Sequence, residues 1–319
     1  MSFASDVKKE LTTVEVNECC YKAELYSIVR HRAQLRISRD GFKIVLETTL
    51  NAIARRIVYL FKEVYNVKAA VSVLKPEVLN QKNKYVITIK DDDFKIMRDL
   101  KVMDDNYSFI VTSKNDFFKN DCCKASIVRG AFLAKGSIND PSKSNYHLEV
   151  LSDNYEGALL LVDLLADVGI EGKIIEREKG FVVYLKKAEQ IGDFLKFVGA
   201  VTSLFNFEDQ RIKRDYNNYV NRLINCDIAN EQKAIASAAK QLENINYLNR
   251  NHGLLNLSSR LIDAIVLRTN FPDYSLSQLS EESEATIGRY ISKSGLSHCF
   301  RDIEKACEEI RRKQNKSTT

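Results

Sequence analysis

Cysteine and histidine are the residue types in this sequence best suited to metal binding or nucleophilic chemistry. No two cysteines have the C-x-x-C spacing of a zinc finger, and their odd number argues against a disulfide framework. The histidines are scattered, with no carboxylate or cysteine at metal-ligand spacing. We therefore expect reduced thiols, no metal site, no cofactor and no catalytic residue. The side chains considered are Cys19, Cys20, Cys122, Cys123, Cys226, Cys299, Cys307, His31, His147, His252 and His298.

Motifs that cradle phosphates or nucleotides are absent from the sequence. There is no P-loop, and no G-x-G-x-x-G opens a helix after a strand. The acidic run Asp91-Asp92-Asp93 stands at the start of an expected helix, 93–102, where the helix dipole favours carboxylates. We interpret this run as a helix-start cluster rather than a metal site.

Composition is that of a soluble protein with two or three domains. The chain has 319 residues, and a hydrophobic fraction of 45% can supply a sizeable core. The 48 basic and 43 acidic residues leave a net charge of +5, so a DNA-binding surface would have to be local. The first residues lack the apolar region of a secretory signal, and no apolar stretch is long enough to span a bilayer. We expect a cytoplasmic protein without a membrane partner.

An internal repeat organises the first two thirds of the sequence. Residues 19–35 align with 122–138 so that two Cys-Cys pairs coincide, and the repeats cover about 19–103 and 122–200. Small residues recur four positions apart in both segments, which places them on one helix face. Such a stripe lets two helix backbones approach closely. We predict that the two helices pack at a pseudo-twofold axis through Ala23, Ser27, Ser126, Gly130 and Ala134.

The pattern that follows these two helices is the same in both halves. Each copy reads helix, two strands, helix, two strands, helix, which is typical of an α+β fold with antiparallel sheets and helices on one face. We assign this duplicated unit to residues 1–213. The expected helices are 51–65, 93–102, 155–168 and 188–198, and the expected strands are 34–38, 42–47, 68–74, 84–90, 146–151, 173–176 and 181–185.

The paired helices resemble the motif helices of LAGLIDADG homing endonucleases, with residues 128–136 over the family's signature. In that family each motif ends in an acid followed by glycine, and the acid holds divalent cations. The matching residues here are Arg32 and Lys135. Both would repel Mg²⁺, which needs anionic oxygen ligands for two-metal hydrolysis. The resemblance implies an αββαββα fold, twice, without nuclease activity. Secondary DNA-binding candidates are Arg30, Arg32 and Lys135.

The C-terminal third has the pattern of a helical linker followed by a helix-turn-helix. The linker, 214–256, has an Asn-rich connection at 215–229, a helix at 232–248 and a break near Gly253. The module 257–312 contains the motif at about 275–308, and a basic tail, 313–319, follows. Ser275 and Gln278 form a predicted capping box. We expect a connection at 283–291, and Ser294 as the cap of a last helix, 295–311.

The last helix has the two faces of a recognition helix. Its packing stripe consists of Leu296, Cys299, Phe300, Ile303, Cys307 and Ile310. A recognition helix reads base edges with side chains near its N-terminus, and phosphate contacts fix its register. We assign base contacts to Ser297, His298 and Arg301, and phosphate contacts to Lys293 and Lys305, with double-stranded DNA as the partner.

A homing-endonuclease-like domain followed by a helix-turn-helix resembles the WhiA regulators of Gram-positive bacteria over nearly the whole chain. The most specific segments are 129–134, 221–226 and 291–298. The resemblance implies a nucleoid-associated transcription regulator linked to cell division, and to sporulation where it occurs. Other transcription or cell-division proteins are candidate partners. The sequence departs from the family pattern at Cys299 and Asp302, where relatives usually carry Arg and Lys.

Two alternative functions stay open at the level of sequence. A three-helix module with a solvated polar face also suits a scaffold that binds cell-division proteins without DNA. An active homing-type endonuclease would rest on fold analogy alone. Because the repeats form an internal pseudo-dimer, we expect a monomer.

Overall fold

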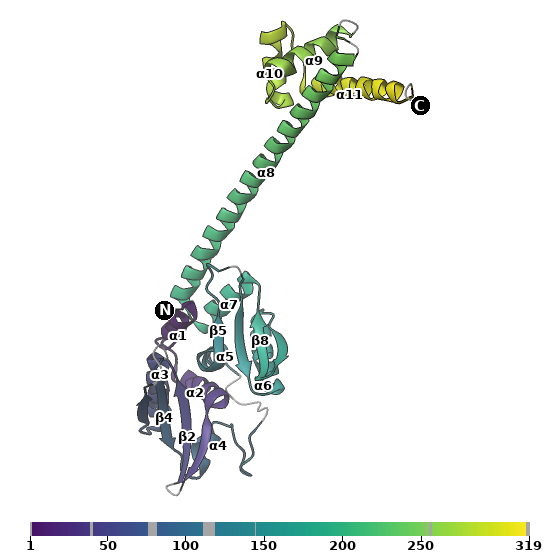
Figure 1. The fold of residues 1–319 in the computed structure, drawn as a ribbon. Helices are drawn as coiled ribbons and strands as arrows, with labels where there is room; N and C mark the ends of the chain where they lie inside the picture. The colour runs from purple at the N-terminus through teal and green to yellow at the C-terminus, as the bar shows by residue number, and fades with distance from the viewer. Residues whose placement is uncertain are drawn as a thin grey trace. The chain divides into compact units, whose positions relative to one another are not determined.

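The computed structural model describes residues 2–38, 41–75, 82–110, 119–143, 145–251, 253–254 and 257–316. His252, considered above as a metal ligand, and residues 317–319 of the predicted tail lie outside these ranges. The chain divides into two compact units, Met1–Asp215 and Tyr216–Thr319 (Figure 1).

The first repeat forms a four-stranded antiparallel sheet of order β1-β2-β4-β3. Along β2 and β4 the side chains of Ile44, Leu46, Ile87 and Ile89 are fully buried, at the two-residue period of a strand with one face on the core. The elements of this repeat are α2 (Glu18–Arg32), β1 (Gln34–Ser38), β2 (Gly41–Thr48), α3 (Asn51–Tyr65), β3 (Ala70–Leu74), β4 (Lys84–Lys90), η1 (Asp92–Phe94) and α4 (Lys95–Asp99).

The second repeat has the same topology, with strand order β5-β6-β8-β7 and antiparallel neighbours. The predicted α+β fold with two αββαββα copies is thereby confirmed. Its elements are α5 (Asp121–Lys135), β5 (Gly136–Ile138), β6 (Leu148–Ser152), α6 (Tyr155–Ala166), β7 (Lys173–Arg177), β8 (Gly180–Leu185) and α7 (Ala188–Val198).

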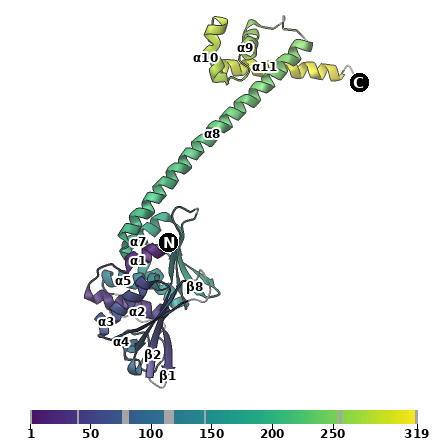
Figure 2. The ribbon, with the colours of Figure 1, turned by 60° about the vertical axis from the view of Figure 1, so that its left-hand side comes forward.

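The two motif helices, α2 and α5, lie against each other between the repeats. Figure 2 shows α2, α3 and α5 together on one side of the strands. Buried side chains from both repeats belong to one continuous hydrophobic core, including Ile28 and Val29 of α2 and Val128 and Phe132 of α5. Burial of this shared core is what joins the two copies into one unit.

Three short elements of the first unit differ from the expectation. Residues 93–102 do not form one helix, because Asp93 and Phe94 have left-handed φ values of 57° and 53°. The Asp91 carboxylate instead accepts hydrogen bonds from the backbone N–H groups of Ile96 and Met97 at 2.9 and 3.2 Å. This acid therefore caps the short α4, which agrees with its interpretation as a helix-start residue. Helix α1 (Phe3–Leu11) and strand β5 had not been predicted.

Helix α8 (Val201–Asn251) runs continuously through the predicted Asn-rich connection at 215–229. The sequence analysis had placed the linker helix only at 232–248, and α8 is longer because residues 201–251 contain neither Gly nor Pro to end a helix. The start of α8 is capped from α1, where the Glu10 carboxylate accepts from the N–H groups of Thr202 and Ser203 at 2.6 and 2.8 Å. An acid at a helix N-terminus also complements its dipole.

The second unit contains the end of α8 with α9 (Ser259–Asn270), α10 (Leu276–Ile287) and α11 (Lys293–Lys316). Its separate core joins Ile245 and Leu248 of α8 to Leu267, Leu279 and Phe300. Helix α11 continues through residues 313–316, which the sequence analysis had assigned to a tail. In the part of the chain that the structure describes, no helix is long and apolar enough to cross a membrane.

Candidate nucleic-acid interface

Helix α10 begins with the predicted capping box. The Ser275 hydroxyl accepts from the Gln278 backbone N–H at 3.3 Å, and the Gln278 side chain accepts from the Ser275 N–H at 2.8 Å. Leu279 is buried on the inner face of the helix. These bonds satisfy two of the backbone donors left open at a helix start and fix where the first helix of the motif begins.

The turn between α10 and α11 is shorter than the predicted connection at 283–291. Helix α10 continues to Ile287 and ends at Gly288, whose φ of 74° is left-handed. Two buried serines hold the turn against α10. The Ser280 hydroxyl donates to the Ile291 carbonyl at 2.7 Å, and the Ser283 hydroxyl accepts from the Ile291 N–H at 2.9 Å. The turn therefore has a defined geometry, as a helix-turn-helix requires.

Helix α11 is capped by Ser292, two residues earlier than expected. The Ser292 hydroxyl accepts from the Gly295 N–H at 3.2 Å, and its carbonyl accepts from the Leu296 N–H. The prediction of Ser294 as the cap was wrong, because Lys293 and Ser294 already have helical positions. Lys293 is thus the first residue of the helix, beside the positive end of its dipole.

The predicted DNA-contacting side chains lie on one exposed side of α11. Lys293, His298, Arg301 and Lys305 are exposed, and Ser297 is half-buried at the edge of the same surface. The opposite side packs into the core of the unit through Leu296, Cys299, Phe300, Ile303 and Cys307, all of which are buried. The arrangement can present an N-terminal helical segment with several cations to a polyanion.

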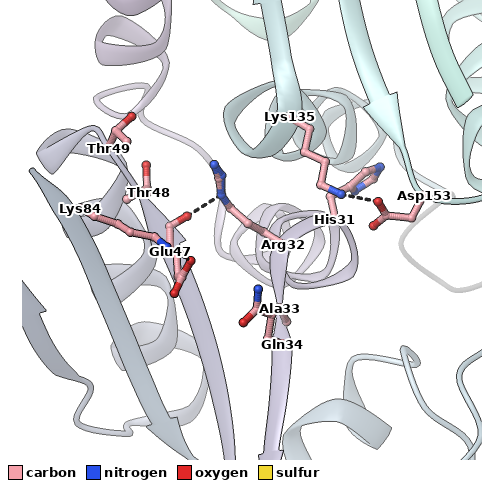
Figure 3. A pocket seen from close by; sticks show the side chains of 10 residues that line it. All are labelled: His31, Arg32, Ala33, Gln34, Glu47, Thr48, Thr49, Lys84, Lys135 and Asp153. Carbon is pink, nitrogen blue, oxygen red and sulfur yellow. Dashed lines mark hydrogen bonds and ion pairs between the residues drawn. The ribbon is translucent and has the colours of Figure 1, made fainter. Parts of the chain in front are cut away.

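The three secondary candidates at the ends of the motif helices all have partners within the protein. The Arg30 guanidinium donates to the Ile110 carbonyl at 3.1 Å. The Arg32 guanidinium donates to the carbonyls of Glu47 and Ala134, at 2.6 and 3.1 Å, and so joins the two repeats. Lys135 pairs with Asp153 at 2.5 Å (Figure 3).

A cavity of about 360 Å³ lies where the two motif helices end, and its lining includes Arg32 and Lys135, which the sequence analysis had matched to the acids of the homing endonucleases. Its lining contains two carboxylates that sequence analysis had not singled out. Asp153 pairs with Lys135, and Glu47 pairs with Lys84 at 2.5 Å. With Arg32 also present, the cations in the lining outnumber the acids (Figure 3).

The side chain of His31 also lines this cavity and is neutral at pH 7. Burial lowers the pKa of the imidazole to about 4, against its ordinary value near 6.5. Its Nδ1 lies 2.8 Å from the Ser27 carbonyl, so the Nδ1–H tautomer donates to that oxygen. The histidine therefore adds no charge, and the cavity has a cationic lining that disfavours a dication.

The predicted small-residue stripe lies in the α2–α5 contact. Ala23, Ser27, Ser126, Gly130 and Ala134 are all buried. The sequence analysis missed a charged group beside them. The Glu24 carboxylate is fully buried and accepts two bonds of 2.9 Å from Arg56, while Arg129 lies 3.4 Å away. The sequence does contain a signal for this buried ion pair. Glu24 and Arg129 are charged residues within helices that are otherwise expected to be buried.

Comparison with known proteins gives matches to three family models that follow one another along the chain. They are described as the WhiA N-terminal LAGLIDADG-like domain (residues 18–103), the WhiA LAGLIDADG-like domain (124–217) and the WhiA C-terminal HTH domain (220–307). The probable cell division protein WhiA of Oceanobacillus iheyensis is 42% identical over 312 residues, which cover 98% of each chain. That of Bacillus cytotoxicus is 42% identical over 311 residues, again 98% of each chain.

The chain belongs to the WhiA family. A solved structure of full-length DUF199/WhiA from Thermotoga maritima superimposes with a TM-score of 0.59 at 24% identity, covering 97% of this chain and 99% of that chain. Because the superposition covers nearly the whole of both chains, the two proteins share the fold of both units.

The two residues that the sequence analysis gave as departures from the WhiA pattern differ in their surroundings. Cys299 is fully buried, and its thiol lies 3.7 Å from the Arg260 carbonyl, so position 299 belongs to the packing side of α11. Asp302 is exposed beside Arg301 and pairs with Arg260 at 3.3 Å. Only the second departure therefore changes the charge of the exposed surface.

Arg268 is a buried cation of the WhiA helix-turn-helix unit that sequence analysis also missed. Its guanidinium donates to the Gln241 side chain at 3.0 Å and to the carbonyls of Phe271 and Tyr274 in the turn before α10. One side chain thus joins α8, α9 and this turn. The sequence pattern of 257–270 predicts an amphipathic helix, and it did not indicate that Arg268 would be buried and would bond to other elements.

Proposed function

We propose that this protein is a DNA-binding transcription regulator that acts in cell division, without nuclease activity. The observation that carries the proposal is the division of α11 into a buried apolar side and an exposed side with Lys293, His298, Arg301 and Lys305. In a helix-turn-helix the second helix of the motif enters the major groove. The names of the relatives, probable cell division protein WhiA, supply the process.

The proposed contacts follow from position along α11. Ser297, His298 and Arg301 lie within the first turns, where side chains reach base edges, and Arg301 can form a bidentate pair with guanine. Lys293 at the helix start and Lys305 further along contact phosphates on either side. Asp302 reduces the local positive charge, and its ion pair with Arg260 partly offsets this effect.

The loss of nuclease activity is proposed from the cavity at the ends of α2 and α5. Glu47 and Asp153 could in principle ligate a dication, but each is paired with a lysine, and Arg32 lies between the repeats. Incubation of the full chain with supercoiled DNA and Mg²⁺ should leave the DNA intact. Cleavage that a chelator abolishes would contradict this part of the proposal.

The motif-helix unit has at most a secondary role in DNA binding in this account. Arg30, Arg32 and Lys135 would each have to exchange an intramolecular bond for a phosphate contact. Substitution of Lys135 by Ala is therefore expected to weaken duplex binding much less than substitution of Lys293 by Ala. Equal losses from the two variants would move the main contact surface to the motif helices.

Genome-wide crosslinking in the native host tests the proposed function. The expected result is a set of enriched DNA sites upstream of genes, with transcripts of those genes changed when the protein is absent. Absence of enriched DNA together with captured cell-division proteins would favour the scaffold alternative instead. The proposal includes a monomer in the nucleoid, which size-exclusion chromatography and imaging of a tagged chain can check.

A further inference from the structure

Each motif helix begins with a pair of adjacent cysteines. Cys19 and Cys20 are in the first turn of α2, and Cys122 and Cys123 are in the first turn of α5. Because the helices pack side by side, the two pairs meet at one end of the α2–α5 contact. In each pair the first cysteine is exposed and the second is buried, so the pairs are related by the pseudo-twofold axis of the repeats.

The four sulfur atoms have the spacing of a single tetrahedral metal site. All four Sγ atoms lie within 4.8 Å of one another. The Sγ of Cys19 is 3.9 Å from that of Cys20 and 3.9 Å from that of Cys122. Zinc–sulfur bonds of about 2.3 Å in a tetrahedron place neighbouring sulfurs about 3.8 Å apart. The four cysteine side chains would therefore need to move only slightly to bind an ion.

The surroundings also suit a bound cation of soft character. Thiolate ligands select zinc over the hard cations Mg²⁺ and Ca²⁺. The positive ends of the α2 and α5 dipoles offset part of the negative charge of four thiolates. A surface hollow lined in part by Cys19 and Cys123 gives access to the cluster. An iron–sulfur cluster fits less well, because its cysteines bind different irons and are spread more widely.

We propose that Cys19, Cys20, Cys122 and Cys123 bind one zinc ion, which joins the starts of the two motif helices. This inference replaces the expectation of no metal site, which rested on the absence of C-x-x-C spacing. The ligands are instead two C-C pairs separated by about a hundred positions in sequence, and only the packing of the duplicated helices brings them together. The site is structural, because four protein ligands leave no open coordination position.

Metal uptake by the reduced full-length protein tests the proposal. Cobalt(II), added under anaerobic conditions, should bind at about one ion per chain with the charge-transfer absorption of a four-thiolate site, and zinc should displace it. Replacing the exposed pair, Cys19→Ser with Cys122→Ser, should abolish that absorption. The control is Cys226→Ser, which removes an exposed cysteine of α8 and should bind cobalt like the unmodified chain. Absence of uptake by the unmodified chain, or equal uptake by both variants, would overturn the site.

A second measurement needs no variant and so does not depend on how the variant folds. With zinc bound, alkylation of Cys19 and Cys122 should slow by at least about tenfold, since a metal-bound thiolate is a poor nucleophile, while Cys226 should react at an unchanged rate. Peptide mass spectrometry reports each cysteine separately. Equal alkylation of Cys19 and Cys122 with and without zinc would rule out the proposed ligands.

Discussion

Gly130 of α5 lies directly against the backbone carbonyl of Glu24 in α2. A Cβ atom at Gly130 would come within 2.6 Å of that oxygen and within 2.8 Å of the Ser27 Cβ. The contact shows why the small-residue stripe matters, because only glycine lets the two motif helices approach to this separation. The shared core of the two repeats depends on that approach.

Substitution of Gly130 by Ala should lower the free energy of unfolding by up to about 2 kcal/mol. Overpacking costs about 1–3 kcal/mol, and the gain of about 1 kcal/mol in helix propensity offsets only part of that cost where the new Cβ meets backbone. The control is Gly192→Ala in α7, where the new Cβ would meet the flexible end of the Glu208 side chain and should stabilise the helix or leave it unchanged. Urea unfolding of both variants measures the difference, and equal effects would contradict the close-approach account.

Substitution of Glu24 by Gln should destabilise the first unit by about 3–5 kcal/mol, the usual cost of breaking a buried ion pair. The change keeps the size of the side chain but leaves Arg56 and Arg129 buried without a counter-charge. The exposed ion pair between Lys124 and Asp167 supplies a control, since Asp167→Asn removes a carboxylate that water already solvates. If both variants unfolded at the same denaturant concentration, the buried cluster would have no special role.

The buried imidazole of His31 predicts a loss of stability in acid. Its pKa is lowered to about 4 in the folded protein, whereas the unfolded chain has the ordinary value near 6.5. The folded state therefore resists protonation. The contribution is fully present above pH 6.5 and is lost as the pH falls toward 4, by about 3 kcal/mol in total.

Thermal or urea unfolding between pH 7 and 4 checks this expectation. His31→Gln should lose less stability over that interval than the unmodified chain, while His298→Gln, at an exposed site, should follow the unmodified profile. Parallel profiles for all three proteins would show that His31 titrates normally.

The duplicated fold could be predicted because its signals are local and occur twice. Apolar periodicity located α3 and α7, and the aligned Cys-Cys pairs revealed the repeat. The continuity of α8 was missed because asparagine is common in connections, although no residue of this segment prevents a helix. Helix α4 was overextended because the left-handed backbone at Asp93 and Phe94 has no signature in residue type.

The features of the candidate sites that could not be predicted from the sequence depend on contacts between residues far apart in the chain. The exposed side of α11 followed from helical periodicity alone. In contrast, the roles of Glu24, Arg268 and the four clustered cysteines depend on partners far away in sequence. The cap at Ser292 was misplaced by two residues because Ser292 and Ser294 are equally suitable by type, and only hydrogen bonding to Gly295 decides between them.

Duplex binding by an Arg301→Ala variant tests the central claim most directly. The measurement is a fluorescence-anisotropy titration at several salt concentrations, with a site recovered by crosslinking and an unrelated duplex, and with Arg250→Ala as an exposed-arginine control. The account predicts salt-sensitive binding by the unmodified chain, and a loss of about 1–3 kcal/mol for Arg301→Ala at the recovered site only. Unchanged affinity of Arg301→Ala for the recovered site would contradict the assignment of α11 as the helix that reads DNA.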